Sequence, residues 1–302
     1  MAKKVVNLKD LSAAEVPQQL KAEYYFDFAS HPFAHRALFD GTRSVVDALA
    51  GIDKYARKWL SEKIAAGAAK EHPCQATCGK VKVLVEPGAV FAPAAVIGAD
   101  KPATIYVAAG ARVVGCHLWP DSGDIYIGAG TMVEPGAGIK GPCIVGAKND
   151  LRQGTYFRGD VVTGDGGAFR GEIKNAVMMD GANFPHPGYV GDSLCGYKTH
   201  FGNQATSANL GIYYLVGGKQ NVVVSIDDVN YDLGRPKIGI VMGDFSQVGC
   251  NSVSDPGTFL APRTIVYQLS RLNKGFYGPD EVLKNKPMEH GIIERSRFKS
   301  FD

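Results

Sequence analysis

One histidine in this sequence is held in a way that suits proton transfer. It stands between two prolines in the segment NFPHPGYVGDS, residues 183–193, so the backbone of His186 has little freedom. A general base must be aimed at its substrate, and an imidazole with an ordinary pKa of about 6.5 is mostly neutral at pH 7. His186 is therefore a candidate base, and the alternative is a surface turn that happens to contain a histidine.

Basic and polar residues recur in the sequence on both sides of this histidine. Arg158 and Lys174 precede it and Tyr189 follows it by three residues. Guanidinium and ammonium groups bind anions such as phosphate, the former through a forked pair of donors. The grouping of a titratable ring with cations and a phenol favours a functional site over a chance turn.

Composition bounds the class of protein that holds these residues. The 302 residues carry a net charge of +3, which is too small to indicate binding of nucleic acid or of a membrane surface. No run of 18 apolar residues and no signal-like N-terminus occurs, so we expect a cytoplasmic protein. Cys74 and Cys78 lack a second pair for a zinc site, and no histidine spacing suits one, so no metal site is expected.

A six-residue period runs through the middle of the chain. From Ile127 to Lys174 the sequence divides into IGAGTM, VEPGAG, IKGPCI, VGAKND, LRQGTY, FRGDVV, TGDGGA and FRGEIK, and every frame except the one at Thr163 begins with an apolar residue. Earlier and later segments repeat the pattern. Three short strands per turn of a triangular coil place one apolar residue inward in each frame. The period predicts a mainly β protein, a parallel β-helix of hexapeptide repeats.

The remaining segments predict what surrounds this coil. Apolar residues at helical spacing predict one helix over 43–66, within a helical and aromatic cap region at 1–80. The coil is expected over 81–267, with excursions at 98–126 and 211–237 where the frame is lost. The lysine- and arginine-rich residues 268–302 are expected to form a solvated tail.

Two blocks of sequence resemble a known family. Residues 172–210, EIKNAVMMDGANFPHPGYVGDSLCGYKTHFGNQATSANL, and residues 233–267 resemble the left-handed β-helix acyltransferases. Within them the match is to the acetyltransferase domain of the enzyme that makes UDP-N-acetylglucosamine, and to stand-alone relatives labelled as related to UDP-N-acetylglucosamine pyrophosphorylase. The resemblance implies a left-handed coil and a homotrimer. A Gly-rich uridyltransferase signature is missing, so pyrophosphorylase activity is not expected.

The resemblance carries roles onto single residues of this chain. His186 falls on the family's catalytic histidine, which takes a proton from the amino group of glucosamine 1-phosphate. Positions that match substrate-binding residues of the family, or that could contact the sugar, are Arg158, Lys174, Tyr189, His200 and Asn209. The stretch from Arg158 to Lys174 is about two residues shorter than in the bifunctional enzyme, so Arg152 is a rival for the phosphate-binding arginine, and a role for Glu172 in orienting the histidine is also open.

A second set of positions matches the acetyl-CoA site of the family. The implied cofactor-binding residues are Asn203, Cys250, Tyr267, Arg235 and Lys237. Asn203 stands where the family uses a backbone N–H to bind the acetyl carbonyl, and a backbone donor survives a change of side chain. The side chains of Asn203 and Gln204 are bulkier than the small residues that the family has at these positions. This bulk could narrow the entry for acetyl-CoA.

The sequence thus predicts an N-acetyltransferase that uses acetyl-CoA as co-substrate and an amino-sugar phosphate as acceptor, without a metal. A different amino sugar or a longer acyl-CoA is an open variant of this hypothesis. The rival hypothesis is a β-helix that has lost its chemistry and serves as a binding or regulatory subunit, since a fold does not dictate a function.

Overall fold

The computed structural model describes residues 4–73, 80–92, 94–98, 100–212, 214, 218, 220–285 and 293–297. The chain forms two compact units. The central unit is Gly51–Pro187, and the terminal unit combines Met1–Ala50 with Gly188–Asp302. The prediction for Cys74 and Cys78 lies outside the described residues.

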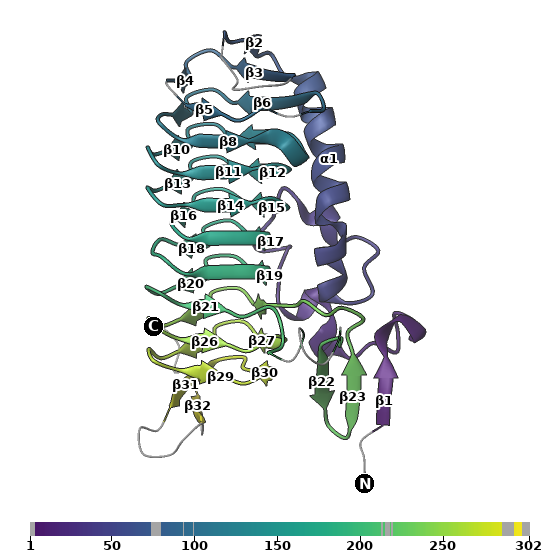
Figure 1. Ribbon diagram of the computed structural model, residues 1–302. Helices are drawn as coiled ribbons and strands as arrows, with labels where there is room; N and C mark the ends of the chain where they lie inside the picture. Colours follow the sequence, from purple (N-terminus) through teal and green to yellow (C-terminus); the bar gives the residue numbers. More distant parts are fainter. Residues whose placement is uncertain are drawn as a thin grey trace. The chain divides into compact units, whose positions relative to one another are not determined.

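The central unit is a coil of short strands, β3 to β18, that stack in parallel (Figure 1), and β2 precedes them. Its strands are β2 (Lys70–Glu71), β3 (Val81–Val85), β4 (Val90–Phe91), β5 (Ala95–Val96), β6 (Ala103–Val107), β7 (Arg112–Val113), β8 (His117–Trp119), β9 (Ile125–Ile127), β10 (Met132–Val133), β11 (Gly138–Lys140), β12 (Cys143–Val145), β13 (Asp150–Leu151), β14 (Tyr156–Arg158), β15 (Val161–Thr163), β16 (Ala168–Phe169), β17 (Glu172–Met178) and β18 (Asn183–Phe184). An antiparallel pair, β2 with β3, begins the coil.

Three columns of strands make the three faces of this coil. One column runs β4, β7, β10, β13, β16, β18, the next runs β5, β8, β11, β14, and the third runs β3, β6, β9, β12, β15. The seven residues of β17 serve two faces, pairing with β14 at their start and with β15 at their end. The protein is therefore a left-handed parallel β-helix, as predicted.

The interior of the coil follows the six-residue frame. All eight residues that begin the frames from Ile127 to Phe169 are at most 1% exposed. Thr163, the one frame start that is not apolar, is buried as well. Its hydroxyl accepts hydrogen bonds from the Gly146 N–H (3.0 Å) and the Asn149 amide (3.3 Å). A buried hydroxyl with partners avoids the cost of an unsatisfied polar group. The frame thus continues through a polar residue.

One α-helix, α1 (Ala48–Ala66), follows a short 3-10 turn (Val45–Asp47) and begins five residues later than predicted. It lies along the side of the coil (Figure 1), so it does not close the coil's end as a cap. Trp59 packs edge-on against Tyr126 of β9, with ring centroids 5.1 Å apart, and Arg57 donates a hydrogen bond to the Ser122 carbonyl. In the described part of the chain no helix is long and apolar enough to cross a membrane.

The terminal unit contains coil turns of its own, built from parallel strands, and a separate small sheet. Its strands are β1 (Lys4–Asn7), β19 (Tyr189–Cys195), β20 (His200–Phe201), β21 (Thr206–Ser207), β22 (Val223–Ile226), β23 (Val229–Asp232), β24 (Ile240–Met242), β25 (Gln247–Val248), β26 (Val253–Ser254), β27 (Thr258–Leu260), β28 (Ile265–Val266), β29 (Arg271–Leu272), β30 (Gly275–Tyr277), β31 (Glu281–Asn285) and β32 (Ile293–Arg297). Short 3-10 turns (Leu8–Asp10, Gln18–Leu20, Ala22–Tyr24 and Arg36–Phe39) follow β1.

The N-terminal residues of this unit pack on its coil. Tyr25 is buried against Phe259, with ring centroids 6.1 Å apart, and the Asp27 N–H donates to the Asp244 carboxylate at 2.8 Å. His31 stacks on Tyr197 at 4.2 Å. The antiparallel pair β22 and β23, within the predicted excursion 211–237, joins β1 in a three-stranded sheet.

Two boundaries differ from the prediction. Residues 98–126, expected to leave the coil, contribute β6 to β9, which pair in register with their neighbours. A 3-10 turn at Pro120–Ser122 lengthens one corner, so the frame slips while the strands continue. Beyond residue 267 the coil also continues, because β29, β30 and β31 pair with β26, β27 and β28. Leu272 and Leu283 are buried among the basic residues that suggested a tail.

Candidate functional site

His186 lies at a corner of the central unit, directly after β18. In-register pairing of β10, β13, β16 and β18 places Glu134, Arg152, Arg170 and Pro185 one above another, each as the first residue past its strand. Backbone hydrogen bonds fix this stack: the Arg152 N–H donates to the Phe169 carbonyl and the Arg170 N–H to the Phe184 carbonyl. In-register neighbours lie about 4.8 Å apart. The corner therefore carries a ladder of charged side chains that ends beside His186.

A surface groove of about 240 Å³ runs along this corner. It is lined by Glu134, Arg152, Gln153, Arg170, Pro185 and His186. We call it the corner groove.

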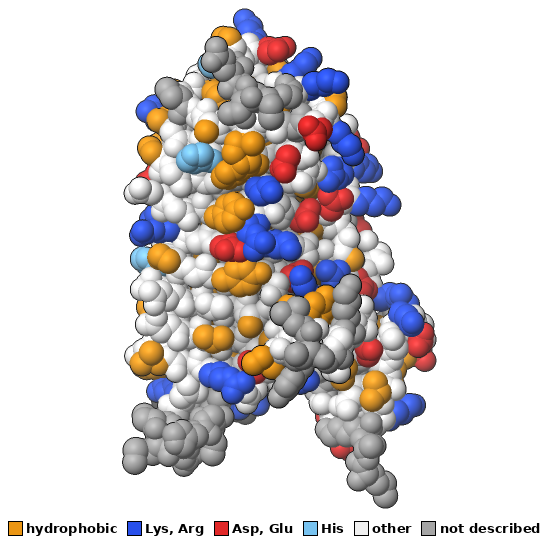
Figure 2. Space-filling view, viewed as in Figure 1, with side chains coloured by type: hydrophobic (Ala, Val, Ile, Leu, Met, Phe, Trp, Pro, Cys, Tyr) orange, Lys and Arg blue, Asp and Glu red, His pale blue; other side chains and the backbone are white. Residues whose placement is uncertain are grey.

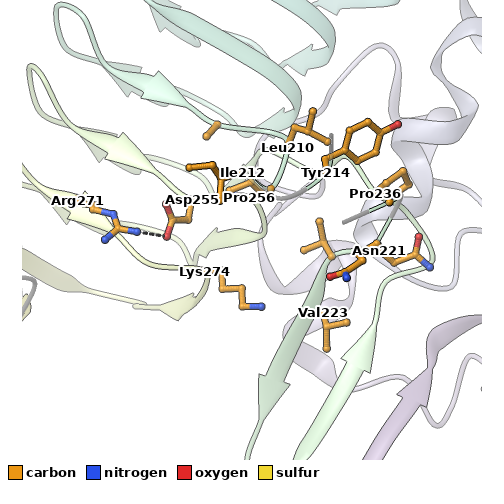
Figure 3. Close-up of a pocket in the computed structure, with 15 residues that line it drawn as sticks. Leu210, Ile212, Tyr214, Asn221, Val223, Pro236, Asp255, Pro256, Arg271 and Lys274 are labelled. Carbon is orange, nitrogen blue, oxygen red and sulfur yellow. Dashed lines mark hydrogen bonds and ion pairs between the residues drawn. The ribbon is translucent and has the colours of Figure 1, made fainter. Parts of the chain in front are cut away.

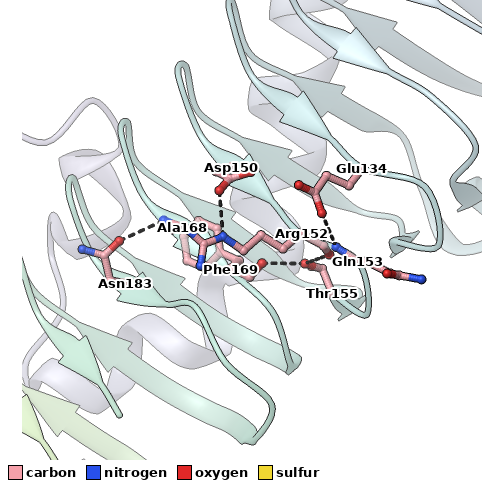
Figure 4. A network of polar contacts seen from close by, with 8 residues as sticks. All are labelled: Glu134, Asp150, Arg152, Gln153, Thr155, Ala168, Phe169 and Asn183. Atoms are coloured by element: carbon pink, nitrogen blue, oxygen red, sulfur yellow. Dashed lines mark hydrogen bonds and ion pairs between the residues drawn. The ribbon is translucent and has the colours of Figure 1, made fainter. Parts of the chain in front are cut away.

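The charged side chains of the corner groove differ in whether they have partners within the protein. Figure 4 shows Arg152 paired with Asp150 (Nε to Oδ2, 2.8 Å) and Glu134 accepting from the Gln153 N–H at 2.8 Å. The side chains of Arg170 and His186 form no hydrogen bond or ion pair with other residues that the structure describes. Both side chains are exposed. The groove thus presents an available guanidinium and an available imidazole, which together suit an anionic substrate.

The adjoining face carries the predicted phosphate-binding residues. Pairing of β11 with β14 aligns Lys140 with Arg158, and the register of β14 with β17 continues to bring Lys174 beside Arg158. Arg158 pairs with Glu172, and Lys140 lies 3.6 Å from Asp121. Lysine, arginine and carboxylate side chains gather over β14 and β17 on the face seen in Figure 2. We call Lys140, Arg158 and Lys174 the cation column.

The register also locates the two-residue shortening noticed in the sequence. Arg152 and Arg170 are 18 residues apart, one full turn of three frames, whereas Arg158 and Lys174 are 16 apart. The shorter turn is accommodated by β17, which spans two faces, with Asn175 in the left-handed conformation (φ 46°) at the bend. Arg158 and Lys174 remain neighbours despite the deletion, while Arg152 belongs to the corner groove.

A carboxyl group lies close to the cation column. Asp160 is about half-buried, and desolvation raises its pKa, aided by Asp53 of α1 and opposed by Arg57 and Lys174. Asp124, which accepts from the Thr104 N–H at 2.7 Å, has a raised pKa for the same reason of burial.

Tyr189 and Asn209 meet in the terminal unit. The Asn209 side-chain amide donates to the Tyr189 hydroxyl at 3.1 Å and to the Asp192 carboxylate at 2.5 Å. Arg235 lies 4.0 Å from the other oxygen of Asp192, and burial lowers the pKa of its guanidinium. Gly191 allows this cluster to close, since a Cβ there would come 2.3 Å from the Tyr189 hydroxyl. Three predicted site residues thus share one polar cluster.

The other predicted residues of the terminal unit lie in separate places. His200 is half-buried in β20, and Lys237 faces Leu210 in an isolated antiparallel bridge. Cys250 is an exposed free thiol, and Lys284 lies over the ring of the 45%-exposed Tyr267 at 4.7 Å. The Asn203 carbonyl accepts from the Asn251 N–H at 2.8 Å. A Cβ on Gly202 would come 2.9 Å from the Cys250 sulfur, so Gly202 brings that thiol close to the backbone before Asn203.

The sequence reasoning missed Arg170. A signal for it was present, because Arg152 and Arg170 occupy positions one full turn of 18 residues apart and both precede the frame of His186. When each six-residue frame is considered by itself, the stacking of Arg152 on Arg170 is not visible. Reading the sequence by turns places the two arginines at one corner.

Comparison with known proteins supports the resemblance that the motifs suggested. No protein-family model matches the chain. The chain is 29% identical over 103 residues to a bifunctional sugar-1-phosphate nucleotidylyltransferase/acetyltransferase of Sulfurisphaera tokodaii, covering 34% of this chain and 24% of that protein. It is 30% identical over 155 residues to the bifunctional protein GlmU of Streptococcus suis, covering 47% of this chain and 32% of GlmU.

A third relative is a putative uncharacterized acetyltransferase, YaiX, of Escherichia coli. It is 28% identical over 149 residues, which cover 47% of this chain and 61% of YaiX. The chain therefore spans between about a quarter and three fifths of the length of these three relatives. Together with the coil, these matches show a chain that resembles the hexapeptide-repeat acetyltransferases related to GlmU.

Proposed function

We propose that this chain, which resembles the acetyltransferase domain of GlmU, is an acyltransferase that moves an acetyl group from acetyl-CoA to the amino group of an amino-sugar phosphate, such as glucosamine 1-phosphate. The observation that carries the proposal is the corner groove, in which an exposed His186 with no described partner shares one surface with two arginines. The acetyltransferase names of the relatives support the class of reaction.

In the proposed reaction the substrate amine attacks the carbonyl carbon of the thioester. A C–N bond forms, the C–S bond breaks, and the sulfur leaves with its electron pair as the CoA thiolate, which then takes up a proton. The imidazole of His186 takes the proton that the amine loses. No covalent acyl-enzyme is required, because holding two substrates in the correct geometry supplies much of the rate.

The cations of the central unit supply the binding of the phosphate in this proposal. Arg158 and Lys174 hold it from the cation column, and Arg170 adds a guanidinium from the corner groove. The Arg158–Glu172 pair is partly exposed, and exposed ion pairs contribute about 0–1 kcal/mol, so a phosphate can replace Glu172 at little cost. In the terminal unit, Tyr189 and Asn209, which share a hydrogen bond, are the proposed contacts of the sugar, with His200 as a further one.

The residues assigned to acetyl-CoA come from the terminal unit. In the proposal the Asn203 backbone N–H binds the acetyl carbonyl, Cys250 and Tyr267 lie along the pantetheine arm, and Arg235 and Lys237 meet the phosphates. The reaction as written needs no metal and no pyrophosphorylase step. The assembly proposed for these sites is a homotrimer, as the resemblance implies.

The test is thiol release from acetyl-CoA in the presence of a panel of hexosamine 1-phosphates. We expect His186→Ala to lower kcat by about 10²–10⁴-fold, the usual contribution of a general base. His117→Ala is the matched control, because His117 is an exposed histidine of the same unit that stacks on Trp119, and we expect unchanged turnover.

Thiol release that is equal in wild type and His186→Ala contradicts the role of the histidine. No release with any acceptor, while calorimetry detects binding of acetyl-CoA or a sugar phosphate, favours the alternative of a binding or regulatory subunit. The bulky side chains of Asn203 and Gln204 are the feature that favours this alternative. Gln204 is exposed and has a left-handed backbone conformation, with φ 58°.

A further inference from the structure

One cavity of the terminal unit has no role in the proposed reaction. It measures about 670 Å³ and lies between β22, the segment that follows β21, and a corner of the coil. Figure 3 shows Tyr214, Pro236 and Val223 on one side and Asp255, Arg271 and Lys274 on the other. Its volume falls within the range of about 300–1,000 Å³ that small-molecule sites occupy. We call it the hairpin pocket.

The walls of the hairpin pocket are fixed by backbone contacts. The Val222 N–H donates to the Arg235 carbonyl at 2.8 Å, and the Leu233 N–H donates to the Val222 carbonyl at 3.0 Å. The hairpin meets the coil at Gly257, where a Cβ would come 2.6 Å from Val222 Cγ1. The Gly257 N–H also donates to the Ile238 and Gly239 carbonyls. A glycine at the point of contact lets the hairpin pack closely on the coil, so this wall of the pocket is held in place.

The lining of the pocket is mainly apolar and carries one unbalanced charge. Apolar side chains come from Leu210, Ile212, Tyr214, Val222, Val223, Pro236 and Pro256. Arg271 is neutralised by Asp255, with Nη2 3.0 Å from Oδ2. Lys274 has no carboxylate within ion-pair distance among the residues that the structure describes. In Figure 3 its side chain extends into the space between the coil and Val223.

This arrangement selects a class of ligand by charge. A nucleotide or coenzyme A carries several phosphate charges, and a pocket with one unbalanced cation leaves most of them without a partner in a largely apolar space. One carboxylate on an apolar body satisfies Lys274 and covers the aliphatic lining, including Ile212, which is 88% exposed. We propose that the hairpin pocket binds a small monocarboxylate with an apolar body, at a site separate from the acyl-transfer reaction.

The probe for this proposal is octanoate, compared with the uncharged 1-octanol by titration calorimetry of the full chain. We expect saturable binding of octanoate by wild type. Lys274→Met keeps most of the apolar stem and removes the charge, so it should weaken octanoate about tenfold or more, the effect of losing a charge-assisted hydrogen bond, and leave 1-octanol unchanged. Lys198→Met, a lysine of the same unit outside the pocket, is the matched control.

A second variant tests the place of binding independently of charge. Val223→Trp puts a bulky residue of high strand propensity into the wall of the pocket, and it should abolish binding of both octanoate and 1-octanol. Thermal unfolding of each variant checks that it folds. The proposal is overturned if wild type does not bind octanoate, if Lys274→Met binds it as tightly as wild type does, or if Val223→Trp folds and still binds. Displacement of octanoate by coenzyme A would also overturn it, since the pocket would then belong to the acyl donor.

Discussion

At the scale of single residues, Arg170 is distinguished by having a charge without a described partner. Arg152, one turn away, is paired with Asp150, whereas Arg170 lines the corner groove next to Pro185 and His186. A guanidinium that is not engaged in the protein is available to a ligand without breaking an internal ion pair. Its contribution to substrate binding should therefore exceed that of Arg152.

We expect Arg170→Gln to raise KM for the sugar phosphate about tenfold or more, with a smaller change in kcat, because a charge-assisted hydrogen bond is worth about 1.5–3 kcal/mol. Steady-state thiol release over a range of acceptor concentrations measures both constants. Arg112→Gln is the control, since Arg112 is exposed on β7 of the same unit outside the groove. An unchanged KM in Arg170→Gln, or an equal rise in Arg112→Gln, would remove Arg170 from the site.

The raised pKa of Asp160 predicts a pH-dependent stability. Because desolvation raises its pKa in the folded state, the folded protein holds the proton more tightly than the unfolded chain does. Folding is therefore penalised as pH rises through the folded pKa, and the penalty disappears below the ordinary aspartate pKa of about 3.9. Asp160 has φ 55°, which asparagine also tolerates.

We expect Asp160→Asn to raise the melting temperature at pH 7–8, and the gain to shrink as the pH falls through the Asp160 pKa. Thermal unfolding of variant and wild type from pH 4 to pH 8 measures the difference. Asp228→Asn in the exposed turn between β22 and β23 serves as the control. A destabilised Asp160→Asn at neutral pH would mean that the ionised carboxylate is held favourably by Arg57 and Lys174.

At the scale of elements, the six-residue frame predicted the coil because each frame start is a packing position. The prediction succeeded from Ile127 to Phe169, where every frame start is buried. It failed at 98–126 because a longer corner at Pro120–Ser122 shifts the frame without breaking strand pairing. Which strands pair between turns depends on their arrangement in three dimensions. A sequence pattern that assumes corners of constant length does not predict that arrangement.

The candidate site was predictable in part for the same reason. His186 could be found from its two prolines, and Lys174 from its resemblance to a family position. The corner groove could not be found frame by frame, because its members come from successive turns. The parallel pairing of β1 with β23 joins distant parts of the chain and carries no local signal in a coil pattern.

Burial of the residue that begins each frame has an energetic consequence. Phe157 is fully buried in β14 and packs edge-on against Phe169, with ring centroids 5.6 Å apart. We expect Phe157→Ala to lower the free energy of unfolding of the central unit by about 3–5 kcal/mol, through lost burial and the cavity left behind. Both tryptophans, Trp59 and Trp119, lie in this unit, so their fluorescence during urea denaturation reports its unfolding.

Tyr156→Ala provides the matched comparison, because Tyr156 precedes Phe157 on the same strand but points outward and is 36% exposed. Its loss should change the free energy of unfolding by much less, since surface substitutions usually have small effects. Equal effects of the two substitutions would contradict the inward and outward alternation that the coil requires.

At the scale of the whole molecule, the main prediction concerns the number of chains in the assembly. The proposed homotrimer should have three times the chain mass of 32.2 kDa in size-exclusion chromatography with light scattering. Apolar side chains exposed on the described surface include Met132, Tyr156, Val253 and Leu269, and contact between copies would cover some of them. A monomer at micromolar concentration would contradict the proposal and leave these residues in water.

The pairing of β1 with β23 has a consequence for the order in which a nascent chain can fold. Turns of the central unit depend on neighbours about 18 residues away, so they can assemble as synthesis proceeds. Residues 4–7 must await a partner at 229–232, and the Asp27 N–H awaits a carboxylate 217 residues later. Strand β1 is thus synthesised long before the strand with which it pairs. During translation, residues 4–50 remain available to chaperones and proteases until most of the chain has been made.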